Sequence, residues 1–149
     1  MVQPLPFLTA APRARFECLQ LKARPEDFRV EELPLYELSG AGDHLYLWIE
    51  KRGVTTHEAV RRLARALGRR PQEAGVAGLK DAQAVARQWV SFEHVTEEEA
   101  LRADAGEAVR VLEVRRHKNK LRMGHLRGNR FVLLLRARGT ALSGEEQTE

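Results

Sequence analysis

One carboxylate in the 149-residue sequence stands where a catalytic group would be expected. Asp81 follows Gly78-Leu79-Lys80 on a predicted loop between a short strand and a longer one. Loops on a rigid scaffold often carry catalytic groups. The neighbouring cations Lys80 and Arg87 would keep the carboxylate ionised, as a nucleophile or a base must be. Lys-Asp is also ordinary turn chemistry, so spacing alone leaves both interpretations open.

A second group of residues suits contact with a nucleic acid. Residues 115–138 contain nine of the 25 Lys and Arg and no Asp or Glu, whereas the rest of the chain has 16 basic against 21 acidic residues. Such a block attracts polyanions through salt-sensitive phosphate contacts; the alternative is a solvated basic face. Within it, Asn129 can read a base edge and Phe131 can stack on a base. Phe131 also begins an apolar strand, which by default makes it a core residue.

A third stretch surrounds Phe28 with charge. Its members are Lys22, Glu26, Asp27, Glu31 and Glu32. On pattern alone these residues predict a solvated turn and a strand edge and nothing more.

Several common classes of site are excluded by what the sequence lacks. The five histidines have no metal-ligand spacing, Cys18 is the single cysteine, and no Gly-x-Ser-x-Gly or Walker loop occurs. We therefore expect neither a metal nor another cofactor. The longest apolar run is far shorter than the roughly 20 residues that span a bilayer. No signal peptide is recognisable at the N-terminus, so we expect a cytoplasmic protein without a membrane partner.

The elements that must position these residues are predicted from periodicity and capping signals. Residues 55–68 predict a helix, with Thr55 and Glu58 as a capping box and Gly68 as the end, and residues 96–103 predict a shorter one. Strands are expected within 16–21, 28–31, 40–53, 75–78, 85–92, 108–117 and 130–138. The sum predicts an α+β fold with a mixed, largely antiparallel sheet and a few helices on one face. Residues 1–138 form the expected domain, and 139–149 the expected flexible polar tail or linker.

Three stretches taken together resemble the TruD family of tRNA pseudouridine synthases. They are LKARPEDFRVEE at 21–32, AGLKDAQAVARQW at 77–89 and RRHKNKLRMGHLRGNRF at 115–131. The resemblance implies isomerisation of a uridine in tRNA, typically uridine 13, to pseudouridine without a cofactor. It makes Asp81 the catalytic residue, which either attacks the nucleoside covalently or abstracts a ribose proton. The implied substrate- and RNA-binding residues are Lys22, Phe28, Lys80, Arg116, Lys118, Lys120, Arg122, Asn129 and Phe131.

The sequence also departs from the family pattern. Ala82, Gln83 and Ala86 stand where the family often has basic residues or a threonine. Family members are more than twice as long, and a downstream motif resembling NYFGxQRFG is absent. The chain therefore looks like the N-terminal half of the catalytic sheet. We expect it to be inactive alone unless a missing C-terminal half or a homodimer mate completes the cleft. The alternatives are a non-catalytic RNA-binding module and a structural fragment without activity.

Overall fold

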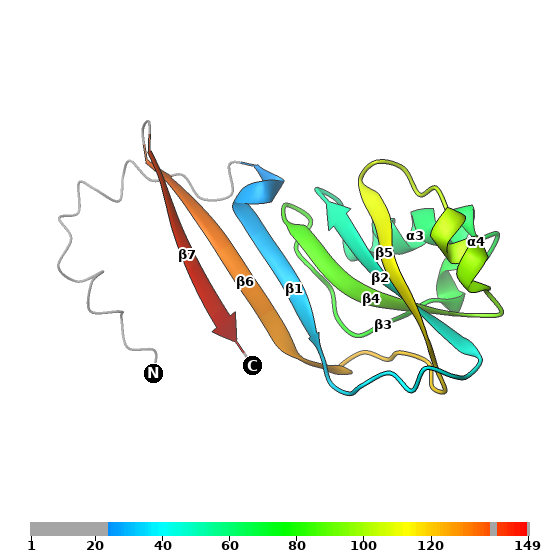
Figure 1. Ribbon diagram of the computed structural model, residues 1–149. Coiled ribbons are helices and arrows are strands. Elements are labelled where there is room, and N and C mark those ends of the chain that lie inside the picture. The colour runs from blue at the N-terminus through cyan, green and yellow to red at the C-terminus, as the bar shows by residue number, and fades with distance from the viewer. Residues whose placement is uncertain (1–23, 138–139, 149) are drawn as a thin grey trace.

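The computed structural model describes residues 24–137 and 140–148, which form one seven-stranded sheet and two α-helices (Figure 1). The strands are β1 (Phe28–Pro34), β2 (His44–Arg52), β3 (Gly75–Val76), β4 (Val85–Glu93), β5 (Val109–His117), β6 (Leu126–Ala137) and β7 (Thr140–Thr148). The helices are α3 (Thr56–Ala66), α4 (Glu97–Arg102) and the 3-10 turns η1 (Pro25–Asp27) and η2 (Pro71–Glu73). The predicted α+β class is confirmed.

The strand order in the sheet is β5-β2-β4-β1-β6-β7, and β3 pairs with β4. Among the strands that the structure describes, only β1 and β4 run parallel and every other pair is antiparallel, as the predicted mixed sheet requires. β1 pairs with the first residues of β4 only from Arg29 to Glu31. Farther along the same edge of β4, at Val90 and Ser91, the pairing partner is β3. The sheet therefore forks beside β4, and the chain between β3 and β4 runs past this fork.

The two α-helices lie at the β2–β5 end of the sheet (Figure 1). Helix α3 begins where the sequence predicts, because the Thr55 side chain accepts a hydrogen bond from the Glu58 N–H at 3.0 Å. It ends before Gly68, whose φ of 66° suits a left-handed cap. The apolar stripe of α3 packs against alternate residues of β2 and β4 in the main core. Strands β1, β6 and β7 extend beyond this helical layer.

A smaller apolar cluster covers the β1–β6 part of the sheet. Val30, Ala84 and Ala86 are buried there, and the half-buried Phe28 and Phe131 pack against them. Val30 faces Phe131 across the β1–β6 ladder and Ala86 across the β1–β4 ladder, so these side chains share one sheet face. It is the face that carries α3, because Ala86 lies opposite Lys51 on β2, in line with the core residues of that strand.

The predicted flexible tail is not what the structure describes for residues 140–148. They form β7, which pairs antiparallel with β6 along its whole length. A polar composition does not prevent this, because backbone groups alone make the ladder at the edge of a sheet. The strand predicted within 16–21, and Lys22, lie outside the described residues. Within the ranges the structure describes, no helix is long and apolar enough to cross a membrane.

Candidate active site

Asp81 lies on the loop 77–84, between β3 and β4, and its side chain is exposed. One carboxylate oxygen, Oδ1, accepts the Gln83 N–H at 2.7 Å. The Ala84 N–H approaches the Asp81 carbonyl at 3.4 Å, which closes a turn. The turn that the sequence allows is therefore present. Turn geometry and a solvent-facing carboxylate occur at the same residue, so one does not exclude the other.

The Asp81 loop is anchored from below by a buried lysine. Lys51 on β2 has no exposed surface, and its Nζ donates to the carbonyls of Val54 at 2.7 Å, Asp81 at 2.9 Å and Lys80 at 3.3 Å. Burial lowers the pKa of Lys51 from 10.5 to about 8; the charge of Asp81 raises it and that of Lys80 lowers it further. The peptide that carries Asp81 is thus tied to the sheet and to the start of α3.

Two more buried side chains fix the first half of the loop. The Thr56 hydroxyl accepts the Lys80 N–H at 2.8 Å and donates to the Gln88 Oε1 at 3.0 Å. The Gln88 amide nitrogen in turn donates to the Gly78 carbonyl at 3.1 Å. Thr56 opens α3 and Gln88 lies on β4, so helix and sheet hold the loop together. Loop polar groups that would be costly to bury unpaired are satisfied in this way.

The side chain of Lys80 points into the fork of the sheet. Its Nζ lies 3.4 Å from Oε1 of Glu32 on β1, and the two side chains are 2% and 1% exposed. The second Glu32 oxygen accepts the Trp89 N–H of β4 at 2.9 Å, where the β1–β4 ladder has ended. Burial raises the pKa of Glu32, while Lys80 and the Trp89 N–H oppose that shift. Lys80 is therefore placed as a structural cation, and this differs from the expected contact with RNA.

Phe131, Asn129 and the Asp81 loop come together on one face of the sheet. Phe131 stacks on Phe28 with 5.7 Å between ring centroids and 4° between ring planes. Both rings pack against the cluster of Val30, Ala84 and Ala86, in which Ala84 closes the Asp81 turn. Asn129 precedes Phe131 by two residues on β6 and therefore shares its face. The aromatic and amide that the sequence singles out therefore lie on the sheet face that Ala84 of the Asp81 loop also covers, and Phe28 supports the aromatic ring.

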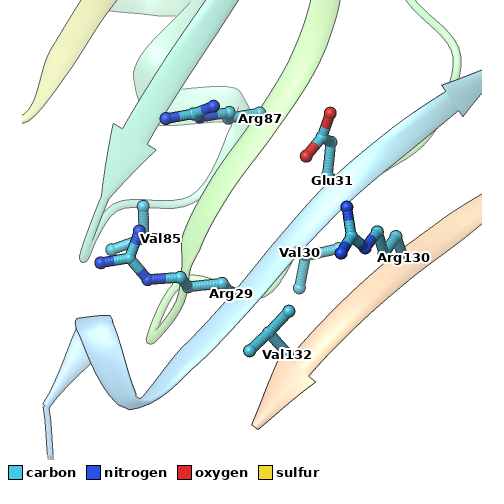
Figure 2. Close-up of a pocket in the computed structure, with 7 residues that line it drawn as sticks. All are labelled: Arg29, Val30, Glu31, Val85, Arg87, Arg130 and Val132. Carbon is cyan, nitrogen blue, oxygen red and sulfur yellow. The ribbon is translucent and has the colours of Figure 1, made fainter. Parts of the chain in front are cut away.

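A charged hollow lies on the opposite face of the sheet (Figure 2). Its charged lining residues are Arg29 and Glu31 on β1, Arg87 on β4 and Arg130 on β6. Arg87 donates to Glu50 at 2.9 Å. The expectation that Arg87 keeps Asp81 ionised is therefore wrong, because strand alternation turns its side chain away from the loop. A buried cation that does interact electrostatically with Asp81 is Lys51.

The basic block, residues 115–138, covers the end of β5, the loop 118–125 and β6, and residue 138 lies outside the described residues. Arg116 is engaged inside the molecule, since its guanidinium bonds Glu97 of α4 at 2.7 Å and the Val95 carbonyl at 3.1 Å. Lys118 and Arg122 are exposed, and Lys120 is half-buried. The loop joins the site through a hydrogen bond at 2.7 Å from the Gly124 N–H to the Ala77 carbonyl, where the Asp81 loop starts.

Sequence reasoning missed the polar side chains beneath the Asp81 loop. The sequence pattern does not single out Lys51, Thr56 or Gln88, and it predicts that Glu32 lies on a solvated strand edge. One signal was present for Lys51: it continues the alternation Leu45, Leu47, Ile49 and so falls on the buried face of β2. A lysine at such a position needs internal partners.

Known proteins resemble the chain over most of its length. The family model for tRNA pseudouridine synthase D (TruD) matches residues 17–148. Proteins named tRNA pseudouridine synthase D from Anaeromyxobacter sp. (strain Fw109-5) and Anaeromyxobacter dehalogenans (strain 2CP-C) are 59% and 54% identical to it. These matches cover 78% and 89% of this chain, and 33% and 37% of the respective relatives.

A solved structure, that of a putative tRNA pseudouridine synthase D from Methanosarcina mazei, superposes with a TM-score of 0.71 at 29% identity. The superposition covers 78% of this chain and 26% of that one. The chain therefore spans about a third of the length of the curated relatives it matches. With the fold, the Asp81 loop and the family match over residues 17–148 in agreement, the chain belongs to the TruD family.

Proposed function

We propose that this chain supplies the catalytic aspartate of a tRNA pseudouridine synthase, with Asp81 acting on a uridine. The observation that carries the proposal is an exposed carboxylate on a loop held by buried polar side chains, next to an aromatic pair. A nucleophile or base must be accessible and held in one place. A surface turn without a function has no need of a buried lysine, threonine and glutamine beneath it.

The aromatic and amide groups suit the base of the target nucleotide. In the reaction the glycosidic bond from the ribose to N1 breaks, the uracil turns, and a bond from the ribose to C5 forms; C5 loses its proton and N1 gains one. The base must first leave the helical stack. Phe131 offers a ring that Phe28 already holds in one orientation, and Asn129 lies on the same face for the edge of the base. We therefore assign stacking to Phe131 and base recognition to Asn129.

Phosphate contacts are proposed for the exposed cations of the loop 118–125. Lys118 and Arg122 are exposed there, and Lys120 is half-buried beside them. Arg116 is excluded from this set because its guanidinium is already bonded to Glu97. Since Gly124 is tied to Ala77, tRNA held by this loop would lie close to the Asp81 loop. Lys22 remains a proposed substrate-binding residue on the family resemblance alone.

The chain spans about a third of its relatives, so we propose that further polypeptide, or a second copy of the chain, completes the cleft. Alone, the chain is expected to bind tRNA weakly and to leave it unmodified. The completed enzyme is expected to act on uridine 13 in the cytoplasm and to need no cofactor.

A chimaera tests the proposal. The chain would replace the matching segment of the Fw109-5 relative, which is 59% identical over 116 residues. We expect the chimaera to release tritium from tRNA labelled at uracil C5, and chemical mapping to locate the pseudouridine at position 13. A folded chimaera that binds tRNA and releases no tritium would contradict the enzyme and favour a non-catalytic RNA-binding module. Failure to bind tRNA at all would contradict both.

A further inference from the structure

We propose that Lys51 is a positioning residue for Asp81, whose protonated amine holds the catalytic loop in place and whose deprotonation releases it. The proposal rests on the proposed role of Asp81 and adds a residue that does not touch the substrate. It makes the geometry of the loop, and through it the reaction, depend on pH.

The geometry at Lys51 uses every proton of the ammonium group. A protonated lysine has three N–H donors and no acceptor. Lys51 Nζ has three carbonyl partners, those of Val54, Lys80 and Asp81, at 2.7, 3.3 and 2.9 Å. A neutral amine keeps two N–H groups and presents a lone pair, so one carbonyl would lose its donor and face repulsion. Deprotonation therefore changes the loop contacts themselves.

Two of the three carbonyls, those of Lys80 and Asp81, belong to the peptide groups on either side of the Asp81 α-carbon. The third, that of Val54, lies at the turn that leads into α3. Lys51 thus joins a rigid helix start to the backbone of Asp81, while the Asp81 carboxylate itself stays exposed. Movement of Nζ by a fraction of an ångström would shift the carboxylate relative to a bound nucleoside, which is enough to slow a positioned reaction.

The charges around Lys51 place its titration near neutral pH. The loop contributes Asp81, which favours the protonated amine, and Lys80, which disfavours it. Lys80 is itself paired with Glu32 of β1. The facing residues of the neighbouring strands, Ala86 on β4 and Val109 on β5, carry no charge. Burial is the largest effect, and together these groups bring the Lys51 pKa to about 8.

Nuclear magnetic resonance on the 149-residue chain tests the coupling directly. With carbon-13 in lysine and nitrogen-15 in the backbone, we expect Lys51 to titrate with a midpoint near pH 8. The amides of residues 79–83 should shift with the same midpoint. The Gly106 N–H, bonded to Asp104 in a similar turn, should not follow the Lys51 midpoint.

Two variants test whether the protonation state of Lys51 controls the position of the Asp81 loop. Asp81→Asn removes the favourable charge and should lower the Lys51 midpoint by about one pH unit. Lys51→Arg keeps a cation that does not titrate in this range, so the amides of residues 79–83 should stay constant from pH 6 to 10. If Lys51→Arg does not fold, the wild-type and Asp81→Asn titrations still decide the question. Loop amides that stay still while Lys51 titrates, or an ordinary Lys51 midpoint, would overturn the proposal.

The chimaera supplies the functional readout. Its rate should fall above the Lys51 midpoint, to about a tenth one pH unit higher, because that fraction of Lys51 remains protonated. Lys51→Arg should move this alkaline fall to higher pH. Loop titration without any alkaline fall would refute the positioning role and leave the proposed enzyme intact. A chimaera without activity would instead refute the enzyme, whereas the amide titration would still report on the loop.

Discussion

Replacing Lys80 with methionine should destabilise the fold through Glu32. The Lys80 Nζ and the Glu32 Oε1 are 3.4 Å apart, with side chains 2% and 1% exposed, so the change leaves a buried carboxylate without its cation. Removing one partner of a buried ion pair costs about 3–5 kcal/mol. That is a large share of the roughly 5–15 kcal/mol that holds a typical domain folded. We expect a loss in this range at pH 7.

A second substitution tests whether the lone charge is the cause. Glu32→Gln in the Lys80→Met background removes the charge and keeps an oxygen for the Trp89 N–H. The double variant should lose only about 1–2 kcal/mol. Burial already raises the pKa of Glu32, and loss of Lys80 removes a charge that opposes this shift. A raised carboxyl pKa lowers stability as pH rises through it, so the Lys80→Met loss should shrink in acid.

Urea unfolding followed by the fluorescence of Trp48 and Trp89 measures these free energies. The matched control is Lys118→Met, because Lys118 is an exposed lysine; it should change stability by less than about 0.5 kcal/mol. A Lys80→Met loss below about 1 kcal/mol would refute the reasoning. So would a double variant no more stable than the single one, since the unpaired charge could then not be the cause.

Two further predictions concern Lys51 and the basic block. Between pH 8 and 10.5 the unfolded chain keeps the Lys51 proton that the folded chain has lost. The free energy of unfolding of the wild type, relative to that of Lys51→Met, should therefore rise by about 3 kcal/mol across this range. A difference that does not change with pH would contradict this. In tRNA binding by the chimaera, Lys118→Gln and Arg122→Gln should each reduce the salt slope by about one. Arg116→Gln should leave the slope unchanged because Glu97 already holds that cation, and an equal reduction there would show Arg116 on phosphate.

Local patterns predicted the secondary structure well. Helix α3 carries its own start and stop signals in Thr55, Glu58 and Gly68, and the residues that form β2, β4 and β5 alternate or run apolar between turn residues. Strand β7 could not be found this way, because its place comes from backbone pairing with β6 and leaves little trace in side-chain pattern. The fork beside β4 depends on pairing between distant segments, which no local window contains.

The exposed residues of the candidate site were predictable from the sequence, whereas the buried contacts that support them were not. The GLKD loop, Asn129 and Phe131 stand in motifs, so the sequence indicated them and the structure brings them to one face. The partners of Lys80 and Arg87 could not be read from spacing, because a side chain's face follows from its strand and register. Lys80 turned inward to Glu32, and Arg87 turned to Glu50 on the opposite face.

The most direct test of the central claim is Asp81→Asn in the chimaera, compared with Asp104→Asn. Both aspartates are exposed, and each accepts a hydrogen bond from the N–H two residues ahead, at 2.7 Å for Asp81 and 3.0 Å for Asp104. Both variants therefore alter a turn of the same kind, and any effect of that change should appear in both. The account predicts that Asp81→Asn abolishes tritium release while tRNA binding persists, and that Asp104→Asn retains both. An Asp81→Asn chimaera that turns over normally would contradict it.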